Sequence, residues 1–409
     1  MKNDFITRSC AGFIALGAGL FTLAHAAWAI DPIKIGVVGG EAAPGSEWRM
    51  AQRRDGLAAA LKVINDAKGA LGRPFKLVFE ERQGPADKAG DAVEKLITQD
   101  KVVAIIGGHE SAAALASLEA AHEHKVPFVT DAPSHAIGGK LYPEAFNVGI
   151  SGTEIATRIA EAMKALEVKR VVAFAENTDA GIEAANLLGR QLNASSTGVQ
   201  YAFETLDPAA KDFTAVLQPY RSNPPDAIVQ LVRSPGAYRL IDQFKQQEIA
   251  PSAKTWLYDA TALIEDPAFW QNVNGPIDGT LVLGTYHPKM TMPDLGRKVA
   301  EAYRAKTEKE PGSQVFQAAD TLFVIAAAIE SGGSSEPEAI TKALESLAWT
   351  GTRGKITFST ERADEKYHQW LNVPTVTYQI TAAKQPIGET RLVQEPDKPF
   401  DPAQVARPK

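Results

Sequence analysis

Two short segments place small and hydroxyl-bearing residues directly after apolar, β-branched runs. The first is IIGGHESAAAL, residues 105–115, and the second is VPFVTDAPSHAIG, residues 126–138. Each run is typical of a buried parallel strand, and an alanine-rich helix follows each loop. The start of a helix carries unpaired N–H groups and a partial positive charge, so a carboxylate binds there without a cation. Because Ser111 begins the first helix and Ser134 lies in the second loop, we predict that both loops bind one small anionic ligand.

An acidic residue, Asp259, follows the apolar segment TWLY, residues 255–258. A carboxylate at that strand end would bind an ammonium group, so Asp259 and the serine loops together suit a zwitterion. The alternative roles are structural: Ser111 then only caps its helix, and Asp259 is an ordinary turn or cap residue. His109 and His135 lie in the same two loops, where they either line the site or serve the fold.

Motifs for catalysis and metal binding fit the sequence poorly. GISGT, residues 149–153, lacks the spacing of a nucleophile elbow, and VVGGEAAPG, residues 37–45, lacks the Lys-Ser/Thr pair of a Walker loop. His122 and His124 are two residues apart, on different faces of a helix, and are expected on the solvated surface. We therefore expect no enzyme, no cofactor and no metal site, with an exported hydrolase as a weak alternative.

The composition is that of a globular protein, with 44% hydrophobic and 8% aromatic residues in a chain of 409. The formal net charge is −6, and no run of Lys or Arg offers a surface for phosphate backbones, so nucleic acid is not an expected partner.

The N-terminal segment has the pattern of an export signal. Two basic residues precede an apolar stretch at 10–23, and AWA, residues 27–29, offers a small-x-small cleavage site after Ala29. We expect a signal peptide over residues 1–29 and a mature protein in the periplasm. The single cysteine, Cys10, falls inside that segment, so the mature chain needs no disulfide to fold in an oxidising compartment.

Strand-like and helix-like segments alternate along the remaining chain, which predicts an α/β fold of two doubly wound parallel-sheet lobes. In the first series the expected strands are 33–39, 75–81, 102–108 and 126–130, and the expected helices are 50–67, 87–99 and 111–123. In the second series the expected strands are 170–175, 199–204, 227–232, 255–258 and 279–286, and the expected helices are 153–166, 180–193, 211–220 and 236–247.

Three further helices have no strand between them, so we expect them to return to the first lobe. They lie near 293–306, 314–330 and 336–347. We expect the β-like tail from Gly354 to Ile380 to close the second lobe. Lobe 1 then comprises 30–150 plus 285–355, lobe 2 comprises 151–284 plus 356–409, and the crossings fall near 149–152, 283–287 and 353–359. A hinge of three segments of this kind places a ligand in the crevice beyond the strands' carboxyl ends.

Several segments resemble the periplasmic leucine/isoleucine/valine-binding proteins, the type I ligand-binding receptors of branched-chain amino acid ABC transporters. They are IKIGVV, DGLAAALKVIND, ALGRPFKLVFEERQGPADKAGDAVEKLI, VVAIIGG, ESAAA and VPFVTDAPS, and the similarity runs from about 33 to 380. The resemblance implies two lobes that close on a ligand, and membrane permease subunits as partners. It matches Ser111, Ala132 and Ser134 to the family's residues for the amino acid's carboxylate and ammonium, and Asp259 to its ammonium-binding acid.

The chain departs from that family at residues expected near the ligand. Two of the family's tyrosines fall at Ala180 and Arg233, and Trp48 and Arg49 stand where an aromatic residue commonly contacts ligand. Arginine binds a carboxylate through a planar fork, so a ligand with a second acidic group competes with a plain branched-chain amino acid. An aromatic acid stacked on Trp48 is a further alternative.

The function that we expect is a periplasmic solute receptor of an ABC importer, with an amino acid as the first candidate ligand. An aromatic acid, a dicarboxylate or an amide is the alternative ligand, and a ligand sensor of the same fold is the alternative role. Glu176 is a further candidate ligand-binding residue. If Arg49 and Arg233 do not bind ligand, they are solvated or pair with Glu47 or Glu176.

Overall fold

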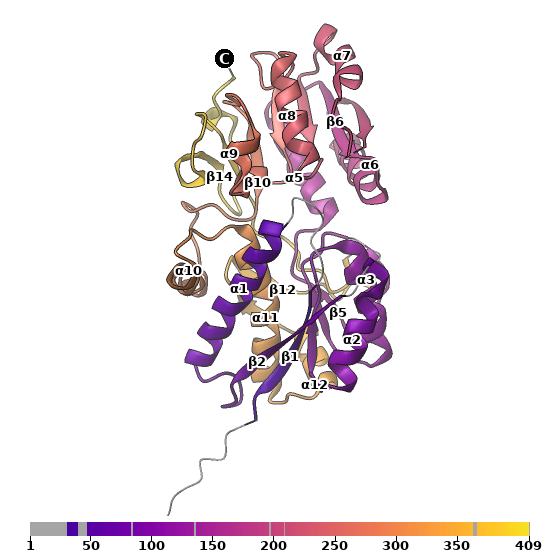
Figure 1. Ribbon diagram of the computed structural model, residues 1–409, viewed down its shortest axis with the longest axis vertical. Helices are drawn as coiled ribbons and strands as arrows, with labels where there is room; N and C mark the ends of the chain where they lie inside the picture. The colour runs from indigo at the N-terminus through magenta and orange to yellow at the C-terminus, as the bar shows by residue number, and fades with distance from the viewer. Residues whose placement is uncertain are drawn as a thin grey trace, which may run out of the picture. The chain divides into compact units, whose positions relative to one another are not determined.

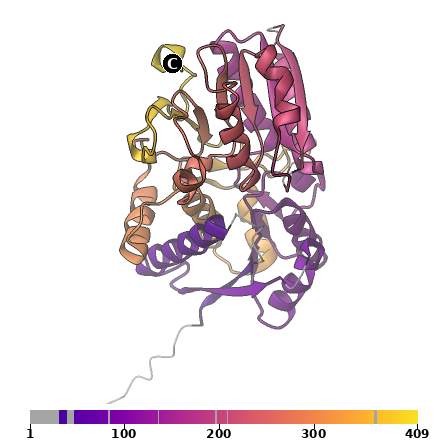
Figure 2. The ribbon, with the colours of Figure 1, turned by 45° about the horizontal axis from the view of Figure 1, so that its top comes forward.

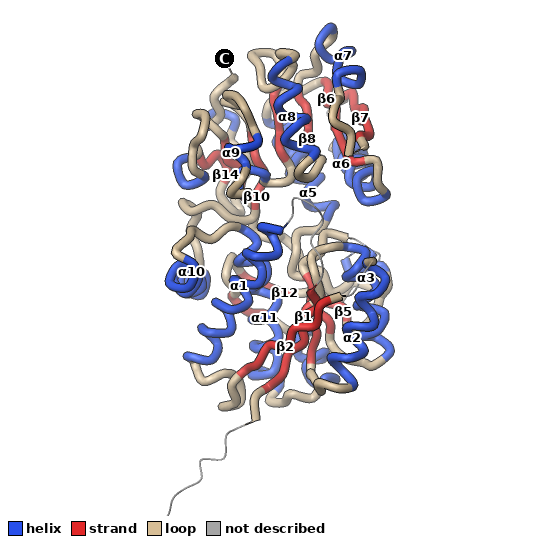
Figure 3. Tube along the Cα trace, viewed as in Figure 1, coloured by secondary structure: helices blue, strands red, loops and turns tan. Residues whose placement is uncertain are grey.

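The computed structural model describes residues 31–39, 47–82, 85–134, 136–195, 198–207, 209–362 and 366–408. Pro32–Lys409 forms one compact unit. The expected signal peptide with Cys10, and the candidate residue His135, lie outside the described residues. The strands form two large sheets and one small hairpin, with helices packed around them (Figures 1 and 3).

The first sheet is entirely parallel, in the order β2-β1-β3-β4-β5. Its strands are β1 (Ile33–Gly39), β2 (Phe75–Glu81), β3 (Ala104–Ile106), β4 (Phe128–Thr130) and β5 (Ala145–Asn147). The helices between them are α1 (Glu47–Asp66), α2 (Ala89–Thr98), α3 (Ser111–Glu123) and α4 (Ala136–Gly139). The four expected strands and three expected helices are confirmed. The sequence pattern missed β5 because AFN is too short, and ends too polar, to read as a strand.

The second sheet has the order β14-β13-β10-β9-β8-β6-β7, in which β13 and β14 run antiparallel to the rest. Its strands are β6 (Arg170–Glu176), β7 (Gln200–Leu206), β8 (Ala227–Gln230), β9 (Trp256–Asp259), β10 (Leu281–Gly284), β13 (Val376–Gln379) and β14 (Arg391–Gln394). Its helices are α5 (Gly152–Ala165), α6 (Asp179–Ala194), α7 (Thr214–Ser222), α8 (Gly236–Gln246) and α9 (Phe269–Asn272). We call each sheet with its helices a lobe.

The three strandless helices return to the first lobe, as expected. They are α10 (Asp294–Thr307), α11 (Ser313–Gly332) and α12 (Pro337–Glu345). Both α10 and α11 pack against α1 (Figure 2). Gly56 permits the close approach of α1 and α11, since a Cβ there would lie 2.5 Å from the Val315 carbonyl oxygen. In the described part of the chain, α11 is the helix long and apolar enough to cross a membrane, but most of it is buried, as in the core helix of a soluble domain.

The β-like tail divides between the two sheets. Val376–Gln379 joins the second sheet as β13, whereas Lys355–Thr357 forms β12 in a hairpin with β11 (Ala348–Thr350). The Trp370 N–H donates to the Asn147 carbonyl at 2.8 Å, so the chain is still beside β5 at that point. We therefore propose that the third crossing lies between Trp370 and Val376 rather than at 353–359, because a strand-like pattern does not specify which sheet the strand joins.

A buried ion pair anchors the segment that follows α12. Arg353 Nε lies 3.0 Å from Asp320 Oδ2, and both side chains are fully buried. Arg353 Nη2 also donates to the Val148 carbonyl at 3.2 Å, directly after β5. The segment after α12 is thus anchored both to α11 and to the first crossing.

Candidate functional site

The two loops of the sequence prediction follow adjacent strands, since β3 pairs with β4. Ser111 is the first residue of α3 and is half-buried, with Glu110 at the N-cap. Ser134 is also half-buried, and its Oγ accepts from the Ala136 N–H at 3.3 Å. Ala132 is fully buried, and both its N–H and its carbonyl have partners within the protein, Thr130 Oγ1 and Asn147 Nδ2. The loops therefore meet at the carboxyl edge of the sheet, where parallel strands leave a ligand site.

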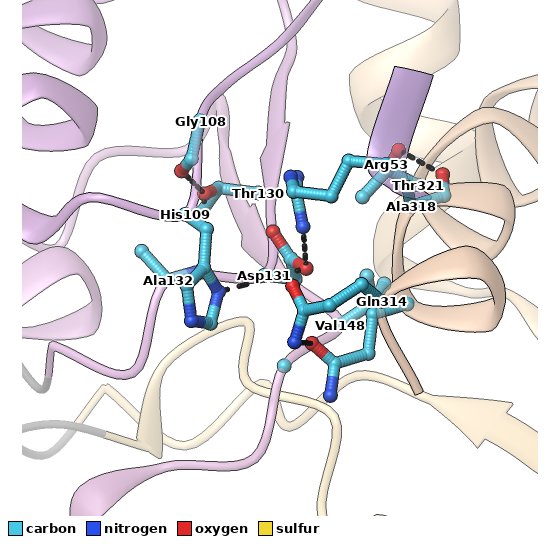
Figure 4. A network of polar contacts seen from close by, with 12 residues as sticks. Arg53, Gly108, His109, Thr130, Asp131, Ala132, Val148, Gln314, Ala318 and Thr321 are labelled. Carbon is cyan, nitrogen blue, oxygen red and sulfur yellow. Dashed lines mark hydrogen bonds and ion pairs between the residues drawn. The ribbon is translucent and has the colours of Figure 1, made fainter. Parts of the chain in front are cut away.

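A buried carboxylate that sequence reasoning overlooked lies in the second loop. Asp131 is 1% exposed, and its Oδ2 accepts from Arg53 Nη1 of α1. His109 Nδ1 lies 3.8 Å from the same oxygen, beyond hydrogen-bond range. Asp131 Oδ1 and His109 Nδ1 are both buried without a hydrogen-bond partner. Figure 4 draws Arg53, His109 and Asp131 as one polar network that also includes Gln314 of α11.

Electrostatics in this network favour an ionised Asp131. Burial by itself would raise the pKa of Asp131, but the Arg53 guanidinium and His109 hold that pKa well below its usual range. Burial lowers the pKa of His109, only partly offset by Asp131, which keeps the imidazole neutral. The network is therefore an Arg–Asp ion pair with a neutral, half-buried histidine beside it.

Asp259 is the last residue of β9, whereas we expected it directly after the strand, and its carboxylate is held by its own loop. Oδ1 accepts from the N–H and the Oγ1 of Thr261, at 2.9 and 2.8 Å, and Oδ2 accepts from the Leu263 N–H at 2.8 Å. The residue is 3% exposed, and burial raises its pKa despite these bonds. This is the arrangement of an aspartate that organises a turn.

The next acidic residue along the chain, Glu265, contacts the first lobe. Its Oε2 accepts from the Ser313 N–H at 2.9 Å and from Ser313 Oγ at 2.6 Å, which caps the start of α11. Glu265 is 8% exposed, and burial raises its pKa. Its other oxygen, Oε1, is buried without a hydrogen-bond partner. A carboxylate from one lobe thus binds a helix N-terminus of the other.

Arg49 makes a second contact between the lobes. From the first turn of α1, its Nη2 donates to the Thr261 carbonyl at 3.0 Å. Its guanidinium carbon lies 4.4 Å from the centre of the Trp48 ring, a cation–π distance. Burial lowers the pKa of Arg49, while the charges of Glu265 and Asp259 oppose that shift. Trp48 and Arg49 therefore lie beside the two acidic residues of the second lobe.

The remaining sequence candidates lie at more open positions. Arg233 is exposed, and its backbone N–H donates to Glu176 Oε1 at 2.8 Å, so the contact that we weighed as an ion pair is a backbone contact. Ala180 is exposed in the first turn of α6. Neither Arg233 nor Ala180 contacts the network around Asp131 or the Glu265–Ser313 contact through a hydrogen bond described here.

Gln52 and Arg53 were overlooked, although their spacing from the candidate Arg49 carried a usable signal. Arg49, Gln52 and Arg53 are spaced three and four apart and so share one face of α1, although the segment WRMAQRR reads as a charged surface. Within the described ranges, no group of three or more His, Cys, Asp or Glu residues is placed to hold a metal ion.

Comparison with known proteins gives a family match over most of the chain. The model of the family described as "Periplasmic binding protein" matches residues 32–381. An amino acid binding protein of Pseudomonas aeruginosa is 24% identical over 312 residues, which cover 73% of this chain and 79% of that protein.

Solved structures share the fold at low sequence identity. A leucine binding protein from Thermotoga maritima has a TM-score of 0.74 and 23% identity, covering 91% of this chain and 100% of the other. A solute binding protein of an ABC transporter from Rhodopseudomonas palustris, in complex with benzoate, has a TM-score of 0.72 and 16% identity, covering 91% and 99%. Proteins that bind chemically different acids therefore have this same architecture.

Proposed function

We propose, since this chain belongs to the periplasmic binding protein family, that it is the solute-binding receptor of an ABC importer. Its ligand is a small carboxylate-bearing molecule, with an amino acid as the first candidate. The observation that carries this proposal is the convergence of both lobes on one polar region. Arg49 of α1 reaches the Thr261 carbonyl of the second lobe, and Glu265 of the second lobe reaches Ser313 of α11.

The first-lobe loops supply the carboxylate end of the proposed site. Ser111 at the start of α3 and Ser134 before α4 offer hydroxyl groups, and the first turn of α3 adds backbone N–H groups and a partial positive charge. A hydroxyl both accepts and donates, so Ser134 can bind the Ala136 N–H and a ligand at once. Trp48 and Arg49 form the neighbouring wall, which suits either a flat apolar group or a second acid.

Binding without chemistry is the activity that we assign. The described residues around Asp131 form an ion pair beside a neutral histidine, an arrangement that serves positioning. The N-terminal segment fits export to the periplasm with cleavage near Ala29, and membrane permease subunits are the proposed partners. Closure of the lobes on ligand would present both lobes to the permease in one fixed relation.

A thermal-shift screen of the chain from residue 30 tests the proposal directly. Amino acids, dicarboxylates and aromatic acids are added to protein from which bound ligand has been removed by partial unfolding and refolding. A ligand that binds only the folded state raises the melting temperature with concentration. Stabilisation by at least one member is expected, and no shift with any member would contradict the proposal.

The serine assignment has its own test. Ser111→Ala and Ser134→Ala should each weaken the best ligand about 2- to 12-fold, the effect of one lost hydrogen bond of ~0.5–1.5 kcal/mol. Ser222→Ala, at an exposed position of α7, is the matched control and should leave affinity unchanged. Titration calorimetry measures all three variants. Unchanged affinity in both site variants would remove the loops from the proposed site.

A further inference from the structure

We propose that a groove on the second lobe, between α6 and the edge strand β7, binds an extended, acidic segment of a partner protein. The segment adds to the sheet as a further strand beside β7 and places a carboxylate against Arg190. We call this surface the α6/β7 groove, and its lining includes Asn186, Gly189, Arg190, Asn193, Tyr201 and Phe203. None of these is a candidate ligand-binding residue, so the proposal goes beyond the receptor function.

The strand β7 ends the second sheet, and one of its sides has no neighbouring strand among the described residues (Figure 3). The Gln200 N–H donates to the Lys169 carbonyl at 2.8 Å, so the even-numbered residues of β7 direct their backbone groups toward β6. The backbone groups of the odd-numbered residues, Tyr201, Phe203 and Thr205, therefore point away from the sheet. This is the spacing of donors and acceptors that an added strand requires.

Two other sheet edges are protected, and β7 is not. The edge at β5 is covered, because the Trp370 N–H donates to the Asn147 carbonyl at 2.8 Å. At β2 the Asn65 side chain bonds both the N–H and the carbonyl of Phe75, at 2.8 and 3.0 Å. In the described ranges β7 has no such cover, and its single charged side chain, Glu204, is held by a tyrosine hydroxyl on the other face of the sheet. An uncharged, uncovered edge is typical of a strand-accepting site.

Beside this edge, α6 leaves a groove of about 470 Å³. Gly189 brings the helix close to the strand, since a Cβ there would lie 2.8 Å from Tyr201 Cε1. The Tyr201 hydroxyl donates to the Ala185 carbonyl of α6 at 2.7 Å, which fixes the ring. The rings of Tyr201 and Phe203 stack with their centres 6.3 Å apart, and both residues are half-buried. The groove thus has an ordered aromatic wall against which side chains of an added strand can pack.

Arg190 gives the groove a positive charge. Asn186, Arg190 and Asn193 are spaced four and three residues apart, so they share one exposed face of α6. Arg190 has no hydrogen bond or ion pair with another residue in the part of the chain that the structure describes. The two asparagines beside it are neutral. A carboxylate from outside the chain is therefore the group that best matches its guanidinium, through a bidentate pair.

Charge also distinguishes an acidic partner from a second copy of this chain. If two copies paired antiparallel through β7, the two-fold axis would be perpendicular to the joined sheet, and both α6 helices would lie on the same face. Arg190 of each copy would then face a helix of like charge, and no acidic residue lines the groove to compensate. An acidic segment instead neutralises Arg190, which favours a partner of that chemistry.

Two designed peptides test the proposal, acetyl-Thr-Val-Asp-Val-Thr-amide and the same peptide with lysine in place of aspartate. NMR titration of the isotope-labelled chain from residue 30 follows each backbone amide. The acidic peptide should shift the amides of Tyr201, Phe203 and Thr205 and bind about fivefold more tightly than the lysine peptide, the effect of one partly exposed ion pair. Arg190→Glu should reverse that order, and Arg221→Glu, an exposed change on α7, should keep it.

Two further changes separate strand addition from binding by charge alone. An acidic peptide with every backbone nitrogen methylated keeps its carboxylate but has no N–H to donate, and it should not bind. Thr205→Pro removes an outward N–H of β7 and leaves the bonds of the even-numbered residues to β6, whereas Thr205→Val keeps that N–H. Only the proline variant should lose the acidic peptide. If Thr205→Pro fails to fold, the methylated peptide provides the same test on the unaltered protein.

Each contrary result overturns a stated part of the proposal. Equal binding of the methylated and parent peptides would exclude strand addition. An unchanged order of the two peptides in Arg190→Glu would exclude Arg190 as the carboxylate-binding residue, and no shift with either peptide at millimolar concentration would overturn the whole proposal. Self-association of the unaltered chain in sedimentation velocity, abolished by Thr205→Pro, would identify a second copy as the occupant instead. None of these results depends on ligand binding between the lobes.

Discussion

Each lobe forms one wall of the candidate site, and buried carboxylates in the two walls have pKa values shifted in opposite directions. In the first lobe Asp131 lies against Arg53, and its pKa is well below the usual range. In the second lobe burial raises the pKa values of Glu265 and Asp259, although the charge of Arg49 opposes both shifts. Burial is similar in the two places, so a directly paired cation decides whether the pKa of the buried carboxylate falls or rises.

The largest effect is expected from breaking the first-lobe pair. Arg53→Met keeps most of the side-chain volume but leaves Asp131 charged, buried and unpaired, so the free energy of unfolding at pH 7 should fall by ~3–5 kcal/mol. The pKa of Asp131 is lower in the folded protein than in the unfolded chain. The stability that Asp131 contributes is therefore fully present above the pKa of the unfolded chain, and it is lost as the pH falls from there through the pKa of the folded protein. The deficit of the variant should therefore shrink in acid.

Urea unfolding of Arg53→Met at pH 7 and at pH 2.5, below the unfolded pKa of 3.8, measures both effects. Arg54→Met is the matched control, since Arg54 pairs with Glu81 at the surface, with the two side chains 66% and 45% exposed. A surface pair of this kind contributes ~0–1 kcal/mol. Equal losses in the two arginine variants would contradict the contrast between the two walls.

A smaller loss of unfolding free energy is expected from a change in the second lobe, Asp259→Asn. Asp259→Asn keeps one carbonyl oxygen for Thr261 but leaves the Leu263 N–H, which bonds Oδ2, without an acceptor. The cost of one buried, unsatisfied donor is ~1–3 kcal/mol. Asp212→Asn makes the same change at an exposed turn, where Oδ1 accepts from the Thr214 N–H at 2.8 Å and water can replace a lost bond. Hydrogen exchange at residues 261–263 should rise only in Asp259→Asn, and unchanged protection there would count against the turn-holding role.

A fourth carboxylate, the half-buried Glu154, has a pKa shifted in the direction opposite to that of Asp131. Burial raises the pKa of Glu154, in the first turn of α5, from 4.5 to about 7. The folded state therefore holds this proton more tightly than the unfolded state, so stability falls as pH rises from about 4.5 through about 7. Glu154→Gln should be more stable than the unaltered protein by ~1–3 kcal/mol at pH 8 and no different at pH 4.

Melting temperatures across that pH range check the Glu154 prediction. Glu161→Gln removes an acid from the same helix, where Glu161 Oε2 lies 3.2 Å from Arg158 Nη1 and the side chain is 49% exposed. This control should not flatten the pH profile. A Glu154→Gln variant with an unchanged profile would show that Glu154 is ionised at neutral pH.

The smallest effect on stability is expected at Arg233, an exposed residue of the second lobe. Arg233→Ala should change stability by no more than ~0.5 kcal/mol, because the side chain is exposed and its backbone N–H keeps the Glu176 bond. Its effect on ligand affinity sharpens the ligand class. A change of less than about threefold, or ~0.6 kcal/mol, favours a ligand with a neutral side chain, and a much larger loss indicates a second acid group.

Local pattern was sufficient for most of the fold. Apolar β-branched runs predicted β1 and β2 with their observed bounds, and the alanine-rich segment after Gly108 predicted α3 with its observed bounds. The strandless segments predicted the return of α10 and α11 to the first lobe, since helices without a sheet of their own must bury their apolar faces elsewhere. The short strand β5 and the pairing of residues 355–370 were missed, because both depend on which strand a short segment pairs with in the folded protein.

The sequence by itself determined the elements, their order and the position of two serine-bearing loops at strand ends, because these follow from periodicity over neighbouring residues. Only the tertiary structure decided which charged groups meet. Arg53 and Asp131 are 78 residues apart, and Glu265 and Ser313 are 48 apart. A carboxylate's pKa and its free oxygens depend on the donors and cations that surround it in space, and no spacing along the chain specifies them.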